Sequence, residues 1–501
     1  MEEQRVLDAH DVVKILGNFR QNLISTLVFE VAPTPRDLIL SGYPKYGRDE
    51  LRPYFGYDQW VGWMAIPEIM WMHFLDIIGF APGIAQYLDL DWAKRTLTSM
   101  RTRDMDTLER KPEIGHDVNA MLFMLRKELP IQLHRYAHFG WTSYDCIEQA
   151  RALMFLKAHY HVLKPAMDRV DELMRRRIHE FTQKIQMHRT HLQYALPATV
   201  GFWLSVIHRH FVESARHANQ AVEKLTGKVS GATGVGSALN AFEIPQCFAR
   251  TVLNAGESME SFFLTKVMGL GKPSLSTQII DARLWSRYLT EMYFVSSVLG
   301  QLGEDSRILQ SSGIGEVLSI SSTSSTMAHK DSNPVAAEGM VGMYRMNTAE
   351  VLKPFLNMIS DLGRDLCNSR PSRDYQTLII YLYEQLRVAE RLLSQMQCND
   401  EMLARNFGES KFLVMSELLF LALSKAGLSE AHRFVNKEVM PEAKRRRSTL
   451  VVVMDDMAQT NSEVAAVWEM VPSTIKNLLV KPEEYLGDAV EICMVEDENS
   501  L

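Results

Sequence analysis

The sequence predicts an all-α protein with a long central helical bundle and smaller helical N- and C-terminal domains. Apolar residues recur at steps of three and four, which marks one face of a helix. The clearest such stripe consists of Leu378, Leu382, Leu386, Ala389, Leu393 and Met396. Comparable periodicity covers residues 147–185, 197–226, 282–310, 334–362 and 411–426. Strand patterns are scarce, and several of these helices are long enough to form a bundle that subunits can share.

Breaks in the helical pattern divide the chain into three expected domains. Residues 115–145 change from helix to loop, and Cys398-Asn399-Asp400 interrupts a helix. A length of 501 residues also corresponds to about three domains. We therefore expect an N-terminal helical domain at 1–115, a central bundle at 116–373 and a C-terminal helical domain at 374–501.

Composition excludes several classes of protein. The net charge of −7 argues against a general nucleic-acid binder, whose surface should be basic. Five scattered cysteines without C-x-x-C spacing predict free thiols in a reducing compartment and no zinc site. The first ten residues are acidic and polar, and the most apolar run, 412–423, is too short to span a bilayer. We expect a cytoplasmic protein with neither nucleic-acid nor membrane partners.

A serine-rich stretch at residues 321–334 carries the first chemical signal. Its small hydroxyl residues favour a loop, and Pro334 suits the first turn of the next helix. Composition alone would also fit a plain linker. Lys330 and Asn333, however, pair a cation with an amide, which together can receive a carboxylate.

This stretch resembles the signature loop of the fumarase/aspartase superfamily, G-S-S-x-M-P-x-K-x-N-P. The matching residues are Ser324, Ser325, Met327, Lys330, Asn333 and Pro334. Thr323 replaces the glycine, Ala328 replaces the first proline, and one extra residue separates the lysine from the asparagine.

Further segments resemble the adenylosuccinate lyase branch of that superfamily, in its order. Residues 45–51 are similar to R-Y-x-x-P-E-M, 113–145 to T-x-H-D-V and H-Y-G-x-T-S-x-D, and 189–199 to R-T-H-G-Q-P-A-Q-P-T-T. Residues 228–234 are similar to K-x-S-G-A-V-G, although Gly236 stands where the family often has glutamine. Residues 364–373 are similar to R-D-x-x-x-S-x-x-x-R, and their arginines and serines at a helix break independently suit a phosphate.

The resemblance implies an enzyme that eliminates fumarate from a succinyl substrate. Such chemistry needs a base beside a carboxylate, an acid for the leaving group, and cations for the carboxylates. By resemblance Ser324 is the base and His191 the acid. The implied substrate-binding residues are Lys45, Tyr46, His116, Asp117, His138, Thr142, Ser143, Thr190, Lys330, Asn333, Arg364, Ser369 and Arg373. The family needs no metal or organic cofactor and forms homotetramers whose active sites are shared between chains.

Two alternatives stay open. The first is a lyase or cycloisomerase of the same fold that acts on another succinyl-amine or on a carboxymuconate. The phosphate-type residues favour adenylosuccinate and the succinyl-carboxamide imidazole ribotide instead. The second is an inactive homologue kept as an oligomeric scaffold, which the departures at Thr323 and Ala328 would suit. Retention of His191, Ser324 and Lys330 argues against it.

Overall fold

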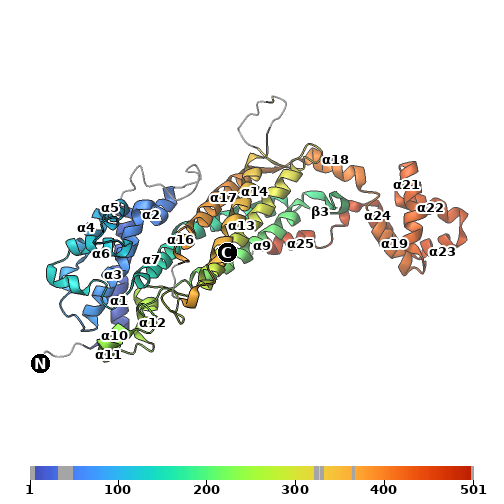
Figure 1. Ribbon diagram of the computed structural model, residues 1–501. Coiled ribbons are helices and arrows are strands. Elements are labelled where there is room, and N and C mark those ends of the chain that lie inside the picture. Colours follow the sequence, from blue (N-terminus) through green and yellow to red (C-terminus); the bar gives the residue numbers. More distant parts are fainter. Residues whose placement is uncertain (1–5, 32–48, 321–326, 328–331, 364–366, 498–501) are drawn as a thin grey trace. The chain divides into compact units, whose positions relative to one another are not determined.

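The computed structural model confirms the all-α prediction (Figure 1). It describes residues 6–31, 49–320, 327, 332–363 and 367–497. These residues form two compact units, and each unit gathers three separate stretches of the chain. The boundaries between the units fall within α8 (Lys164–Phe181), α9 (Val200–Val222), α13 (Arg283–Leu309), α14 (Val335–Glu350) and α17 (Gln376–Gln395). The proposed division at residues 115 and 373 therefore stays a prediction.

Unit 1 comprises residues 1–167, 214–297 and 342–387 and is organised around one apolar helix. Every residue of α3 (Trp60–Ile77) from Val61 to Leu75 is buried. A helix that is apolar all round must be covered on all sides. It contacts α1 (Ala9–Ser25), α4 (Leu90–Ser99), α5 (Thr102–Glu109), α6 (Asp117–Lys127) and α7 (Ser143–Ala158).

Unit 2 comprises residues 168–213, 298–341 and 388–501. Its C-terminal part has a separate apolar core around Leu419, Val453 and Trp468. The helices of this part are α18 (Asp400–Ser410), α19 (Ser416–Lys425), α20 (Ala431–Phe434), α21 (Met440–Arg446), α22 (Leu450–Thr460), α23 (Ser462–Met470), α24 (Ser473–Val480) and α25 (Ala489–Asp497).

The helix predictions from periodicity hold well. The expected helix at 147–185 is a helical run through α7, a π-helical turn at His159–Leu163, and α8. The stripe from Leu378 to Met396 lies buried along α17 and the strand residue that follows it. Asn399 caps α18 by accepting from the Met402 backbone N–H, as a break at this point predicts.

One helix start differs from the prediction. The helix expected from residue 197 begins at Val200 as α9, because residues 185–199 form an antiparallel hairpin of β2 (Ile185–Thr190) and β3 (Gln193–Thr199). The β-branched residues 450–453 form the first turn of α22, which Thr449 caps. The other described strands are short pairs: β1 (Leu7–Asp8) with β4 (Val252–Leu253), and β5 (Val317–Ser319) with β6 (Met396–Cys398).

Within the described ranges, no helix is long and apolar enough to cross a membrane. The same ranges contain no cluster of three or more His, Cys, Asp or Glu residues that could hold a metal ion.

A buried histidine joins three helices of unit 2. His208 of α9 has no exposed surface, and its Nε2 lies 2.6 Å from Asp171 of α8. Its Nδ1 lies 2.8 Å from Glu496 of α25. The ring therefore bridges two buried acidic side chains. His208 thereby ties the C-terminal helix to the long helices.

We expect His208→Ala to lower the free energy of unfolding by about 3 kcal/mol, because it takes the shared partner from two buried carboxylates. His210→Ala on the same helix, but exposed, should change that free energy by less than about 0.5 kcal/mol. Urea unfolding followed by circular dichroism measures both. Equal effects in the two variants would contradict this role.

Candidate active site

The first part of the site lies at the start of α6 in unit 1. Asp117 is the first residue of this helix, and His116 is its N-cap. The Val118 backbone N–H donates to Asp117 Oδ1 at 2.8 Å and to His116 Nδ1 at 3.1 Å. A carboxylate is favoured here because it faces the positive end of the helix dipole. The cap therefore fixes both side chains that the sequence motif predicted.

Asp117 also binds a cation from a distant part of the sequence. Arg373 Nη2 donates to Asp117 Oδ2 at 2.6 Å. Asp117 is buried, whereas about half of the Arg373 side chain is exposed (51%). Asp117 thus orients a guanidinium that still reaches solvent, as a binding group for an anion requires.

Ser369 lies beside the same region, in the short helix α16 (Ser369–Ser372). Burial raises the pKa of the Tyr144 phenol, against a hydrogen bond from Ser369 that lowers it. Tyr144 is the second residue of α7, so this contact places Ser369 at the start of that helix. Four predicted residues, at 116, 117, 369 and 373, therefore surround the beginnings of α6 and α7.

Thr142 and Ser143 begin α7, where a buried carboxylate holds the backbone. Asp145 is fully buried and accepts from the Thr142 backbone N–H at 2.8 Å. It also accepts from Lys228 Nζ at 2.9 Å and from the Ser230 backbone N–H at 2.8 Å. The turn at residues 228–231 is thereby fastened against the start of α7. The motif at residues 113–145 and the motif at residues 228–234 therefore meet at Asp145.

His138 is held in a strained conformation by a residue that sequence reasoning missed. Its φ of 66° is in the left-handed region, which a non-glycine residue adopts only at some cost. Glu68 of α3 accepts from the His138 backbone N–H at 2.9 Å and lies 2.6 Å from its Nδ1. A lone acid within the apolar run of α3 was the available signal, since a buried carboxylate needs a partner.

The charge of Glu68 controls the ionisation of His138. Burial alone would lower the His138 pKa, but the Glu68 carboxylate outweighs it and holds this pKa above its ordinary value. The imidazolium is therefore favoured at a position that the sequence assigned to substrate binding.

An aromatic cavity of about 170 Å³ adjoins Asp117 and Arg373. Its aromatic lining comes from Tyr54, Phe55, Tyr57, Trp60 and Phe155. Asp106, Glu109 and Arg151 also carry charge in its lining. Sequence reasoning did not assign this cavity, although the cluster of aromatics at residues 54–60 was visible.

Other predicted residues lie in unit 2. Thr190 ends β2, and His191 is the first residue of the two-residue turn that follows. His191 and Leu192 have φ values of 54° and 60°, the left-handed pair that a tight hairpin requires. The exposed His191 therefore stands at the tip of a hairpin. Asn333 is half-buried just before α14.

Five predicted site residues lie outside the described residues, so the structure does not test them. They are Lys45, Tyr46, Ser324, Lys330 and Arg364.

We expect His138 to titrate above the ordinary histidine pKa of about 6.5. Glu68→Gln should lower the midpoint, because it removes the negative charge that favours the imidazolium. The stability that His138 contributes should be complete below the ordinary pKa and should disappear as the pH rises through the raised one. Histidine NMR measures the midpoint, and His138→Asn identifies the resonance. A wild-type midpoint at or below about 6.5 would contradict this assignment.

Comparisons with known proteins identify the family of this chain. The sequence profile of a family described as lyase matches residues 98–348, which is half of the chain. The chain is 29% identical to adenylosuccinate lyase of Pyrococcus abyssi over 400 residues, covering 77% of this chain and 81% of that protein. It is 28% identical to adenylosuccinate lyase of Archaeoglobus fulgidus over 403 residues, covering 76% and 82%.

Solved structures show the same fold. A fumarate lyase from Mesorhizobium sp. BNC1 superposes with a TM-score of 0.73 at 20% identity, covering 91% of this chain and 99% of that one. The 3-carboxy-cis,cis-muconate lactonizing enzyme from Pseudomonas putida gives a TM-score of 0.72 at 18% identity, with coverage of 90% and 97%. The chain is therefore a member of the lyase family, in the fumarase/aspartase superfamily, and it resembles the adenylosuccinate lyases of that superfamily.

Proposed function

We propose that this lyase eliminates fumarate from adenylosuccinate and from the succinyl-carboxamide imidazole ribotide of purine nucleotide synthesis. The observation that carries the proposal is the Arg373 guanidinium, oriented by Asp117 beside an aromatic cavity. A guanidinium fork suits a phosphate, and aromatic walls suit a planar base. The similarity to adenylosuccinate lyases over three-quarters of the chain supports the same substrate class.

In this proposal the phosphate is held by charge and hydroxyl groups together. Arg373 and Ser369 supply the part that the structure describes. Lys45, Tyr46 and Arg364 join them by their places in the family motifs. Asp117 contributes indirectly, since it fixes the direction of the Arg373 guanidinium.

The elimination itself needs one base and one acid. Ser324, as an alkoxide, takes a proton from the carbon beside a succinyl carboxylate, and that electron pair forms the double bond of fumarate. The C–N bond breaks, and His191 gives a proton to the leaving nitrogen. Lys330 and Asn333 hold the succinyl carboxylates, and the positive charge of Lys330 stabilises the negative charge that builds up. Thr142, Ser143 and Thr190 donate to the remaining oxygens, and His116 and His138 line the site.

A second candidate is a reaction on an unphosphorylated succinyl-amine or a carboxymuconate. The fold similarity to the muconate lactonizing enzyme favours it, but fold alone does not assign a substrate. Such a substrate has no phosphate for Arg373. The behaviour of Arg373 variants therefore separates the two candidates.

We also propose a cytoplasmic homotetramer whose active sites are shared between chains. The support is the family resemblance and the distribution of the proposed site over distant parts of the sequence, from Lys45 to Arg373.

We expect purified protein to release fumarate from adenylosuccinate. Arg373→Lys should lower kcat/KM for adenylosuccinate by roughly tenfold to a hundredfold, because lysine lacks the fork that binds a phosphate. The same variant should hardly change the slow turnover of the dephosphorylated nucleoside. Chromatographic assay of both substrates measures this. Turnover of a carboxymuconate, with none of adenylosuccinate, would establish the second candidate instead.

Mixing two severely impaired variants tests the shared sites. His191→Ala and Ser324→Ala proteins should each retain only a small residual turnover, because each lacks one of the two proton-transfer groups. After subunit exchange, hybrid tetramers should regain part of the activity through sites that receive both intact residues. Mass spectrometry verifies the exchange, and a verified mixture without regained activity would contradict shared sites.

A further inference from the structure

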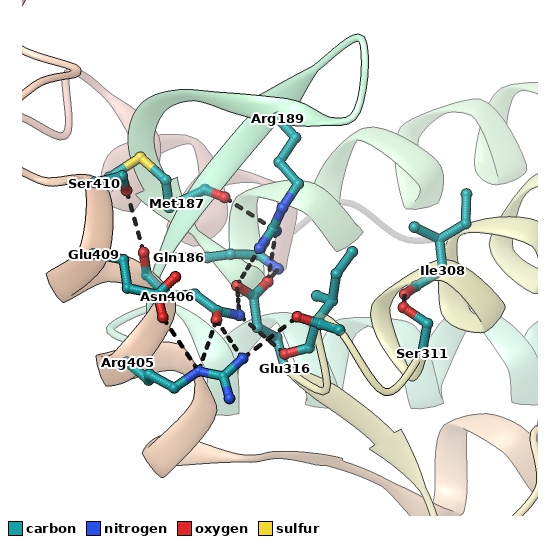
Figure 2. Close-up of polar contacts among 12 residues, drawn as sticks. Gln186, Met187, Arg189, Ile308, Ser311, Glu316, Arg405, Asn406, Glu409 and Ser410 are labelled. Carbon is teal, nitrogen blue, oxygen red and sulfur yellow. Dashed lines mark hydrogen bonds and ion pairs between the residues drawn. The ribbon is translucent and has the colours of Figure 1, made fainter.

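We propose that Glu316 is a positioning residue. Its carboxylate holds in place both the hairpin that carries His191 and the start of the strand that leads into the serine-rich segment. This inference rests on the proposed function, in which His191 is the acid and that segment carries the base. The carboxylate is fully buried, and the catalytic assignment gives it no role of its own. Its contacts link three elements of unit 2 (Figure 2).

Four donors surround the Glu316 carboxylate, two on each oxygen. Oε2 accepts from Gln186 Nε2 at 2.8 Å and from Arg189 Nη1 at 2.9 Å. Oε1 accepts from Arg189 Nη2 at 2.7 Å and from Asn406 Nδ2 at 2.8 Å. The paired contact with Arg189 is a two-point fork, the geometry that best fixes both partners (Figure 2).

On one side, Glu316 fixes the strand that leads to His191. Arg189 lies two residues before His191 in β2, next to a register shift between Met187 and Arg189. Its guanidinium also packs on the Tyr194 ring of β3, 5.0 Å from the ring centre. A bulge re-aims the residues that follow it. The position of Glu316 therefore determines, through Arg189, the direction in which the hairpin tip points.

On the other side, Glu316 precedes β5, which leads into the serine-rich segment. The Glu316 carbonyl accepts from the Asn399 backbone N–H at 2.9 Å, next to the pairing of β5 with β6. Asn406 of α18 donates both to Glu316 and to the Ile314 carbonyl at 2.9 Å. The start of β5 is thus held from α18 and from the hairpin together.

Gln310 contacts the residues at both ends of this segment, Ser319 and Ser332. Its Oε1 accepts from the Ser319 backbone N–H at 3.0 Å, and its Nε2 donates to the Ser332 carbonyl at 3.4 Å. The Ser332 hydroxyl donates to the Ser319 carbonyl at 3.0 Å. Ser332 belongs to the two-residue spacing between Lys330 and Asn333, where the family pattern has one residue. The lengthened spacing therefore contributes Ser332 to the contact with Ser319.

A double-mutant cycle separates positioning from simple stabilisation. Glu316→Gln should lower kcat for adenylosuccinate by about a hundredfold with little change in KM, because small misplacements of reacting groups have effects of this size. Glu316→Asp should recover part of kcat. If Glu316 acts partly through His191, Glu316→Gln should slow the residual turnover of His191→Ala by clearly less than the roughly hundredfold by which it slows the wild type. Equal fold losses in the two backgrounds would overturn the inference.

Glu496→Gln is the matched control, because Glu496 is another buried carboxylate of unit 2 that binds a histidine and Arg209. It should destabilise the protein and leave kcat unchanged. A similar fall of kcat in this control would mean that Glu316→Gln acts through stability alone, which would overturn the inference.

Hydrogen exchange tests the positioning even without turnover. In Glu316→Gln, amides of residues 190–193 and of Ser319 should both exchange at least about tenfold faster than in the wild type, since one carboxylate secures both. If wild-type protein releases no fumarate but both segments loosen together, the proposed function fails and the positioning stands. If fumarate is released and either segment exchanges as in the wild type, the positioning fails and the proposed function stands.

Discussion

The buried Asp145 carboxylate is the contact on which the described part of the site depends. It accepts from Lys228 Nζ and from the backbone N–H groups of Thr142, Ser230 and Gly231. A buried charge without such partners would cost several kcal/mol, so the start of α7 and the turn at 228–231 must meet at this place. The two sequence motifs are therefore one structural feature.

The same need for partners recurs at other carboxylates that contact predicted site residues or their neighbours. Glu68 secures His138, Asp117 orients Arg373, and Glu316 secures the strand before His191. In each case a carboxylate that is buried or nearly buried fixes a side chain with more access to solvent. Such pairs are weak evidence for stability, but they give a site fixed directions. The arrangement suits a reaction in which negative charge must be met at set positions.

The helices and the motif residues could be predicted from the sequence, but the residues that hold those motif residues in place could not. The stripe on α17 was predictable because burial of one helix face leaves a period of three to four. The β2–β3 hairpin was missed because its turn uses His191 and Leu192 at positive φ, where glycine or asparagine is the usual signal. Asp117 and Arg373 are 256 residues apart, so only the fold reveals their contact.

Incorporation of deuterium during the reverse reaction tests the proposed elimination most directly. AMP, fumarate and the protein in D₂O should give adenylosuccinate with one deuterium on the succinyl methylene carbon, because the base returns a solvent-derived proton to that carbon. Proton NMR of the product shows the replacement, and Ser324→Ala should abolish product formation. Adenylosuccinate without deuterium on that carbon, or no adduct while an unphosphorylated substrate is turned over, would contradict the proposed function.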